Sequence, residues 1–213
     1  MNPELPMRRI LSALPVTLAA ALAAAPAWAH HFMDNALPGT FVEGLLSGLG
    51  HPLIGVDHAA FIIATGFLLG RVTGGMWGVA ALVAGSLLGT ASHLNGYDIV
   101  GGEIGVALSV IVAGGLLMGR WRIELSWLIG GLVLAGAWHG HAYAEAIFGA
   151  ETTPLYAYLA GFSLVQLGVA AAAFFAHRRL IATREAWAGP VSAGLGAATG
   201  AVGVVFLAIN IAG

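Results

Sequence analysis

The chain contains no cysteine, and its 213 residues include no lysine. Without cysteine, disulfide bonds, thiolate metal sites and cysteine nucleophiles are all excluded. Charge is also scarce, because only 8% of the residues are charged and the formal net charge is −2. No cluster of basic residues is large enough to indicate nucleic-acid binding.

Apolar residues fill the chain instead. Hydrophobic types make up 59% of it and the mean hydropathy is +0.89, whereas a soluble domain carries about 25% charged residues. A helix needs about 20 apolar residues to cross the bilayer core. Six segments have roughly this length: 52–70, 75–93, 101–119, 125–148, 154–177 and 190–211. The sequence therefore predicts an all-α, polytopic membrane protein whose residues 30–213 form one domain of six transmembrane helices.

Glycine is abundant, with 32 residues, and many glycines are spaced four apart. Such small-xxx-small pairs let membrane helices approach closely. The pairs are Gly66/Gly70, Gly85/Gly89, Gly101/Gly105, Gly115/Gly119, Gly136/Gly140 and Gly196/Gly200. We expect these positions to be helix contacts.

Residues 1–29 are typical of a cleavable signal peptide. An arginine pair precedes an apolar run, and residues 27–29 have the small-x-small pattern of a cleavage site. Cleavage there makes His30 the mature N-terminus. The alternative is an uncleaved first transmembrane helix, and both interpretations place His30 on the extracytoplasmic side.

The arginines predict the orientation. If the mature N-terminus is outside, the loops after the first, third and fifth helices face the cytoplasm. These loops carry all six arginines of the mature chain, namely Arg71, Arg120, Arg122, Arg178, Arg179 and Arg184. The positive-inside rule thus predicts a multi-pass protein of the inner (plasma) membrane with both mature termini extracytoplasmic.

Residues 51–58, His-Pro-Leu-Ile-Gly-Val-Asp-His, place three ionisable groups at the start of an apolar run. Such groups are costly at membrane depth and usually functional, and imidazole with carboxylate is a ligand set for a first-row metal ion. We therefore predict His51, Asp57 and His58 as metal ligands, or Asp57 as the group that orients a ligand imidazole. On a straight helix His51 and His58 share a face, because they are seven residues apart.

The fourth predicted helix carries a second polar group of residues, His139, His141 and Glu145. The helical rise places His58 and His141 at a similar depth, roughly 9–10 Å below the outer end. His139 and His141 point in nearly opposite directions on a straight helix, so either the helix loosens at Gly140 or only one of them is a ligand. We favour His139 as the ligand, with His141 and Glu145 lining the approach.

Three further histidines are candidate ligands. His93 ends the second predicted helix on the outer side, although a helix–helix hydrogen bond is the simpler interpretation for it, as for His177. His30 and His31 offer amine, amide and imidazole nitrogens, which with one membrane histidine would make a square-planar site suited to Ni(II) or Cu(II). Alternatively, His30 and His31 form a solvated tail.

At these residues the chain resembles the HupE/UreJ family of nickel and cobalt permeases. The family's HPxxGxDH motif is complete here, as His51, Pro52, Gly55, Asp57 and His58. Its shorter HGxA...E motif is present as His139, Gly140, Ala142 and Glu145. The chain departs from many members at 61–63, where they have Met, and at 143–144, where they have His and Gly. The resemblance implies Ni²⁺ or Co²⁺ as transported cargo. We expect no resident cofactor.

The predicted function is secondary-type uptake of Ni²⁺ or Co²⁺ by a permease that is not an enzyme; Zn²⁺ also stays open as cargo. No nucleotide-binding motif is present in the sequence. The alternatives are an intramembrane zinc-dependent hydrolase, a bis-histidine haem protein and an accessory metal-binding membrane protein without autonomous transport. The expected partners are the divalent metal ion, the lipid bilayer and either a downstream metallochaperone or a second copy of the chain; nucleic acid is not expected.

Overall fold

The computed structural model describes residues 37–99, 101–119, 121 and 123–212. This part of the chain consists of helices and their connections, with no strand, so the predicted all-α class is confirmed. The predicted signal peptide, and the candidate ligands His30 and His31, lie outside the described residues.

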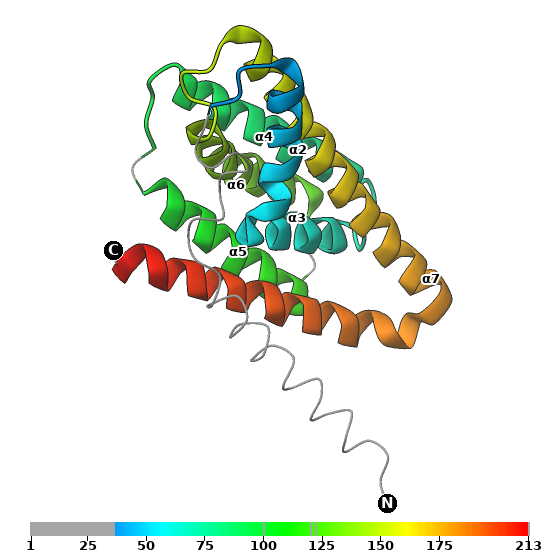
Figure 1. Ribbon diagram of the computed structural model, residues 1–213. Helices are drawn as coiled ribbons and strands as arrows, with labels where there is room; N and C mark the ends of the chain where they lie inside the picture. The colour runs from blue at the N-terminus through cyan, green and yellow to red at the C-terminus, as the bar shows by residue number, and fades with distance from the viewer. Residues whose placement is uncertain (1–36, 100, 120, 122, 213) are drawn as a thin grey trace, which may run out of the picture.

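Six helical elements follow one another along the described part of the chain (Figure 1). They are α2 (Phe41–Ile54), α3 (Val56–Leu69), α4 (Met76–Leu94), α5 (Gly102–Met118), α6 (Leu125–Glu145) and α7 (Thr152–Ala212). α7 consists of two helical arms, because Arg184 has a non-helical backbone (φ −149, ψ 56). In Figure 1 the second arm turns back from the first and runs beside α5.

Length and composition make several of these helices candidate membrane spans. Among the described residues, α4 and α7 are long and apolar enough to cross a membrane, and the α2–α3 pair is a third candidate if the two count as one broken span. α5 is a shorter apolar helix of 17 residues. All six predicted apolar segments lie on helices.

The first predicted span differs from the observed structure. The prediction of a straight helix from near Pro52 is wrong, because α2 already begins at Phe41 and the chain bends by 76° before α3. A capping box starts α2: the Thr40 hydroxyl accepts from the Glu43 amide, and the Glu43 carboxylate accepts from the Thr40 amide. The break follows Pro52, which has no amide hydrogen to donate, and falls at Gly55, whose backbone is extended (φ −66, ψ 103).

Glycines bring the helices into close contact and reveal their relative directions. The contacts are Gly44 with Pro154, Gly48 with Tyr158, Gly66 with Ala170, Gly85 with Val133, Gly89 with Ala137, Gly140 with Ser86, Gly114 with Gly200, and Gly203 with Ile111 and Ala107. The order of these contacts makes α4 parallel to α6, and makes α2 and α3 parallel to the first arm of α7. α5 runs antiparallel to the second arm. These directions agree with helices that cross a membrane alternately.

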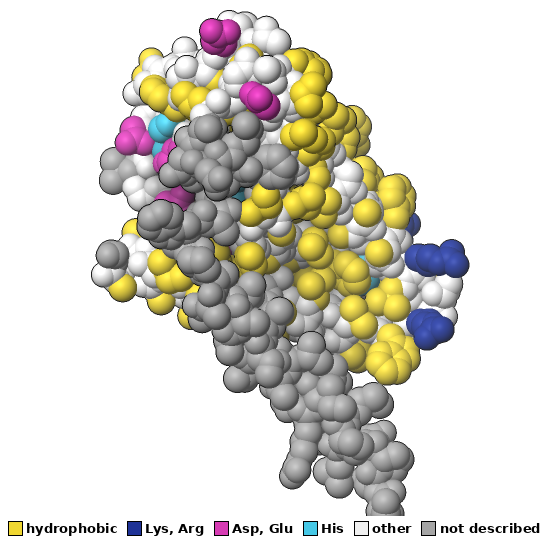
Figure 2. All heavy atoms as spheres, viewed as in Figure 1, with side chains coloured by type: hydrophobic (Ala, Val, Ile, Leu, Met, Phe, Trp, Pro, Cys, Tyr) yellow, Lys and Arg dark blue, Asp and Glu magenta, His cyan; other side chains and the backbone are white. Residues whose placement is uncertain are grey.

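The described surface is typical of a membrane protein. Exposed leucine, isoleucine, valine and phenylalanine side chains occur on every helix, and Figure 2 shows hydrophobic side chains along much of one face. The arginine side chains and the acidic side chains visible in Figure 2 lie at opposite ends of the molecule. Four exposed tryptophans lie near the helix ends that adjoin the arginines, as membrane-interface anchors do: Trp77, Trp121, Trp127 and Trp187.

Candidate metal site

The break between α2 and α3 gathers three of the predicted ligands. His51 lies in the last turn of α2, and Asp57 and His58 lie in the first turn of α3; all three are buried. The ring centres of His51 and His58 are 5.7 Å apart. The two histidines are therefore neighbours, but they lie on two helices at a bend and not on one face of a straight helix.

Asp57 is held at the start of α3. Its carboxylate accepts a hydrogen bond from the His58 amide at 2.8 Å, and a carboxylate is favourable in the first turn of a helix. The same oxygen, Oδ1, lies 4.0 Å from His58 Nδ1. Asp57 thus places a buried carboxyl group beside the His58 imidazole.

α6 brings His139 into this group of residues. His139 is fully buried, and its Nδ1 lies 2.7 Å from Nδ1 of His58. Its ring stacks on Phe61 of α3, and its Nε2 lies 2.9 Å from the Ser109 hydroxyl of α5. We call His51, Asp57, His58 and His139 the inner cluster.

The hydrogen bonds around His139 define which nitrogens carry protons. The Ser109 hydroxyl donates to the Val106 carbonyl at 2.7 Å, so it accepts from Nε2–H of His139. Nδ1 of His139 is then an acceptor, and Nδ1–H of His58 is the donor to it. The lone pair of the neutral His58 ring therefore lies on Nε2.

A similar chain orients His51. The Tyr158 hydroxyl donates to the Tyr143 carbonyl at 2.8 Å and therefore accepts from Nδ1–H of His51 at 2.9 Å. The lone pair of the neutral His51 ring also lies on Nε2. A hydrogen bond at one ring nitrogen that leaves the other basic is the usual preparation of a metal-ligating histidine. Two imidazoles on one ion have ring centres roughly 4.6–6.5 Å apart, from metal–nitrogen bonds of about 2.1 Å, and the observed 5.7 Å falls in this range.

His141 belongs to a different group of residues. Its Nε2 lies 2.8 Å from Oδ1 of Asp98 and 2.9 Å from Nδ1 of His93. Within the described ranges, His93, Asp98 and His141 are the group of three metal-binding side chains whose ligand atoms all lie within 4.8 Å of one another. We call these three residues the outer cluster. His139, the residue of α6 that we favoured as the ligand, contacts His58, whereas His141 contacts His93.

The remaining predicted ligand of α6, Glu145, is exposed at the end of that helix. It is a member of neither cluster. His93 makes the predicted hydrogen bond between helices, and its partner is the candidate ligand His141.

Sequence reasoning missed Asp98, Ser109 and Tyr158. Asp98 follows the helix-end His93 by five residues, and this spacing was a usable signal for a shared site. Ser109 and Tyr158 look like ordinary residues of apolar helices, so only the packing of α5 and α7 against the histidines reveals their roles.

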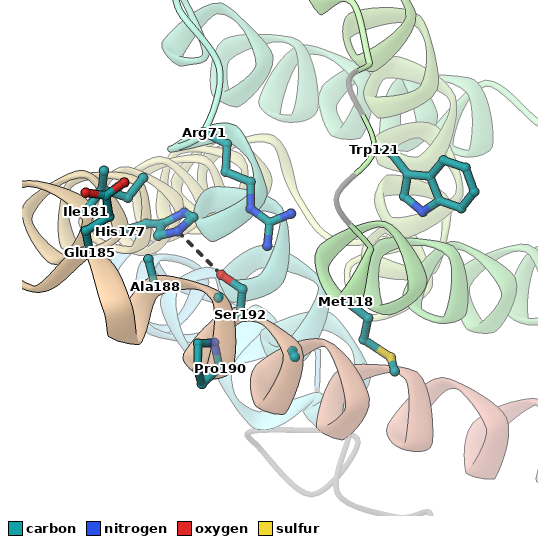
Figure 3. A pocket seen from close by; sticks show the side chains of 11 residues that line it. Arg71, Met118, Trp121, His177, Ile181, Glu185, Ala188, Pro190 and Ser192 are labelled. Carbon is teal, nitrogen blue, oxygen red and sulfur yellow. Dashed lines mark hydrogen bonds between the residues drawn. The ribbon is translucent and has the colours of Figure 1, made fainter.

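A cavity of about 650 Å³ lies at the other end of the molecule, beside the bend of α7 (Figure 3). Arg71, His177, Glu185 and Ser192 are among its lining residues. The Arg71 guanidinium donates to two carbonyls at the end of α5, of Leu117 and Gly119. His177 hydrogen-bonds to the Phe67 carbonyl and lies 3.4 Å from the Ser192 hydroxyl, so it links helices as predicted.

A known protein family matches most of this chain. The sequence model of the HupE / UreJ protein family matches residues 18–206, a range that includes both clusters. No curated protein and no solved structure matches the chain. The matched family is a membrane family associated with nickel and cobalt uptake. Because the match covers most of the chain, the chain belongs to the HupE/UreJ family.

Proposed function

We propose that this chain is an uptake permease for Ni²⁺ or Co²⁺ of the inner membrane, and that the inner cluster binds the ion during transport. The observation that carries the proposal is the burial of two histidines and an aspartate at a helix break, in contact with His139. Three ionisable groups at such a position are energetically costly, so they usually serve a function.

The helix break itself favours cation binding. The last turn of α2 ends at Ile54, so its carbonyl groups present a partial negative charge near His51. Discontinuous helices with such ends are a common way for membrane transporters to bind ions. The neighbouring start of α3 carries partial positive charge. Asp57 offsets this charge, because its carboxylate accepts a hydrogen bond from the His58 amide.

The hydrogen bonds of the inner cluster suit a site that must release its cargo. Binding through Nε2 of His51 and His58 leaves their Nδ1–H donors on Tyr158 and His139. Protonation of Nε2 competes with the metal for the same lone pair, so proton exchange offers a route for release. A transport site needs this moderate affinity so that the ion can leave.

The arrangement of charge supports the inward direction. Exposed Arg178, Arg179 and Arg184 surround the bend of α7, which the positive-inside rule assigns to the cytoplasm. The 650 Å³ cavity lies beside the same bend and contains His177 and Glu185 in its lining. We propose this cavity as the inner vestibule through which the ion leaves.

The test is uptake of radioactive Ni²⁺ and Co²⁺ by cells that express the wild type, His58→Ala or Glu151→Gln at matched membrane levels. We expect uptake above the vector control, a loss of at least tenfold in His58→Ala, and full uptake in Glu151→Gln, whose position is exposed. The ion taken up faster identifies the cargo. Absence of uptake of both ions by correctly inserted wild type would overturn autonomous transport and favour an accessory metal-binding role.

A further inference from the structure

The outer cluster joins three elements at the end of the molecule away from the α7 bend. His93 lies in the last turn of α4, Asp98 in the following loop, and His141 near the end of α6. His141 Nε2 is 2.8 Å from Asp98 Oδ1 and 2.9 Å from His93 Nδ1. Asp98 Oδ1 and His93 Nδ1 are 4.0 Å apart. Ligand atoms around one transition-metal ion are about 3.0–3.4 Å apart, given bonds of about 2.1 Å. Small side-chain shifts therefore suffice to form a three-ligand site.

Hydrogen bonding alone does not account for the surroundings of His141 Nε2. The backbone amide of Ile99 donates toward this nitrogen from 3.1 Å, while the Asp98 carboxylate, which only accepts, lies 2.8 Å from it. One ring nitrogen carries either a hydrogen or a lone pair, so it cannot satisfy both neighbours. A cation between Nε2, the carboxylate and His93 Nδ1 removes the repulsion between the lone pair and Asp98.

The three side chains of the outer cluster differ in their exposure to solvent. The Asp98 side chain is 78% exposed, that of His93 is 19% exposed and that of His141 is 4% exposed. An ion therefore meets a solvated carboxylate first and two increasingly buried imidazoles afterwards. Two imidazoles and one carboxylate select a first-row transition-metal ion over Mg²⁺ or Ca²⁺, which prefer all-oxygen sites.

The outer cluster is also mechanically joined to the inner one. His141 and His139 flank Gly140, whose carbonyl accepts from the Thr90 hydroxyl of α4 at 2.7 Å. Thr90 lies one turn before His93. The same contact between α4 and α6 thus positions a histidine of each cluster.

We propose that His93, Asp98 and His141 form a second binding site for a divalent first-row transition-metal ion, separate from the inner cluster, which captures the ion from the extracytoplasmic side. Metal binding by the outer cluster is independent of the proposed transport activity, and only the capture role rests on it. Co²⁺ serves as the probe, because its visible absorption reports nitrogen and oxygen ligands directly.

The experiment is a Co²⁺ titration of the purified full-length protein in detergent, compared among wild type, Asp98→Asn, His58→Gln and Glu151→Gln. Each variant is first checked for an unchanged melting temperature and elution volume. We expect Asp98→Asn to weaken one class of Co²⁺ sites at least tenfold and to change its absorption spectrum. We expect that class to persist in His58→Gln and in the exposed-acid control Glu151→Gln.

A titration that is the same in Asp98→Asn and wild type overturns the second site, and so does the absence of Co²⁺ binding by wild type. The first result does not bear on uptake through the inner cluster, which the His58→Ala transport assay measures. Loss of the Asp98-dependent class in His58→Gln would also contradict the proposal, since the two clusters would then be one site. If uptake fails while Asp98-dependent binding is found, transport is wrong and the outer site stands.

Discussion

His139 and His141 are separated by one residue in α6 and contact different histidines. His139 Nδ1 lies 2.7 Å from His58 of α3, whereas His141 Nε2 lies 2.9 Å from His93 of α4. Residues two apart on an α-helix are rotated by about 200°, so they face opposite sides. α6 therefore separates the two clusters, and a displacement of this helix disturbs both of them.

Gly140 tests this dependence. A Cβ atom at this position would collide with the carbonyl of Ser86 in α4, so we expect Gly140→Ala to push the helices apart and destabilise the protein by about 1–3 kcal/mol. We expect a lower melting temperature for the detergent-solubilised protein. We also expect slower metal uptake. The control is Gly130→Ala in the same helix, where a Cβ meets open space. Equal melting temperatures for the two variants would contradict the close contact.

Tyr158→Phe tests the orientation of His51. The substitution removes a buried hydroxyl that accepts from His51 and donates to the Tyr143 carbonyl. We expect a loss of about 1–3 kcal/mol in stability and roughly a tenfold lower metal affinity, measured as a raised KM for uptake. Tyr156→Phe is the matched control, because that side chain is 67% exposed. Unchanged uptake in Tyr158→Phe would show that His51 needs no such orientation.

Gly55→Ala tests the helix break. The added Cβ would lie 2.6 Å from Cδ2 of His58, so the His58 ring must move away from its present position. We expect uptake to fall at least severalfold with only a small change in melting temperature, because the backbone angles of Gly55 suit alanine. Gly168→Ala, at a position open to added atoms, should leave uptake intact. Normal uptake by Gly55→Ala would contradict the assignment of His58 to the transport site.

The lack of cysteine makes the orientation directly testable. Single cysteines at Glu151 and Thr183, both exposed, can be introduced without removing native ones. We expect Glu151→Cys to react with a membrane-impermeant maleimide on intact cells. Thr183→Cys, next to the α7 bend, should react only after permeabilisation. The wild type measures background labelling, and the reverse pattern would invert the proposed topology.

Local signals in the sequence predicted the helical class and much of the helix packing. The glycine pairs Gly85/Gly89 and Gly136/Gly140 do form contacts between α4 and α6, because closely packed membrane helices need small residues. The same spacing at Gly115 leads to open space instead. Glycine spacing identifies a helix face on which another helix can pack closely. Which helix packs there depends on the arrangement of all the helices.

The clusters divide in a similar way. Periodicity predicted that His139 and His141 face opposite directions, and it did not reveal which histidine each would meet. The break at Gly55 was not predicted. Proline occurs both in the first turn of a helix and before a helix break, so the local sequence around Pro52 fits either structure. Asp98 was not predicted as a ligand, because 43 residues of sequence separate it from His141.

The sequence by itself determined the family, the all-helical class, the apolar segments and the presence of metal-ligating side chains among them. These properties depend on composition and on contacts a few residues apart along the chain. Only the tertiary structure decided that His58 meets His139, that His141 meets Asp98, and that the histidines form two clusters. Those pairings depend on which helices pack side by side and in which direction, and they arise from contacts between residues that are far apart in the chain.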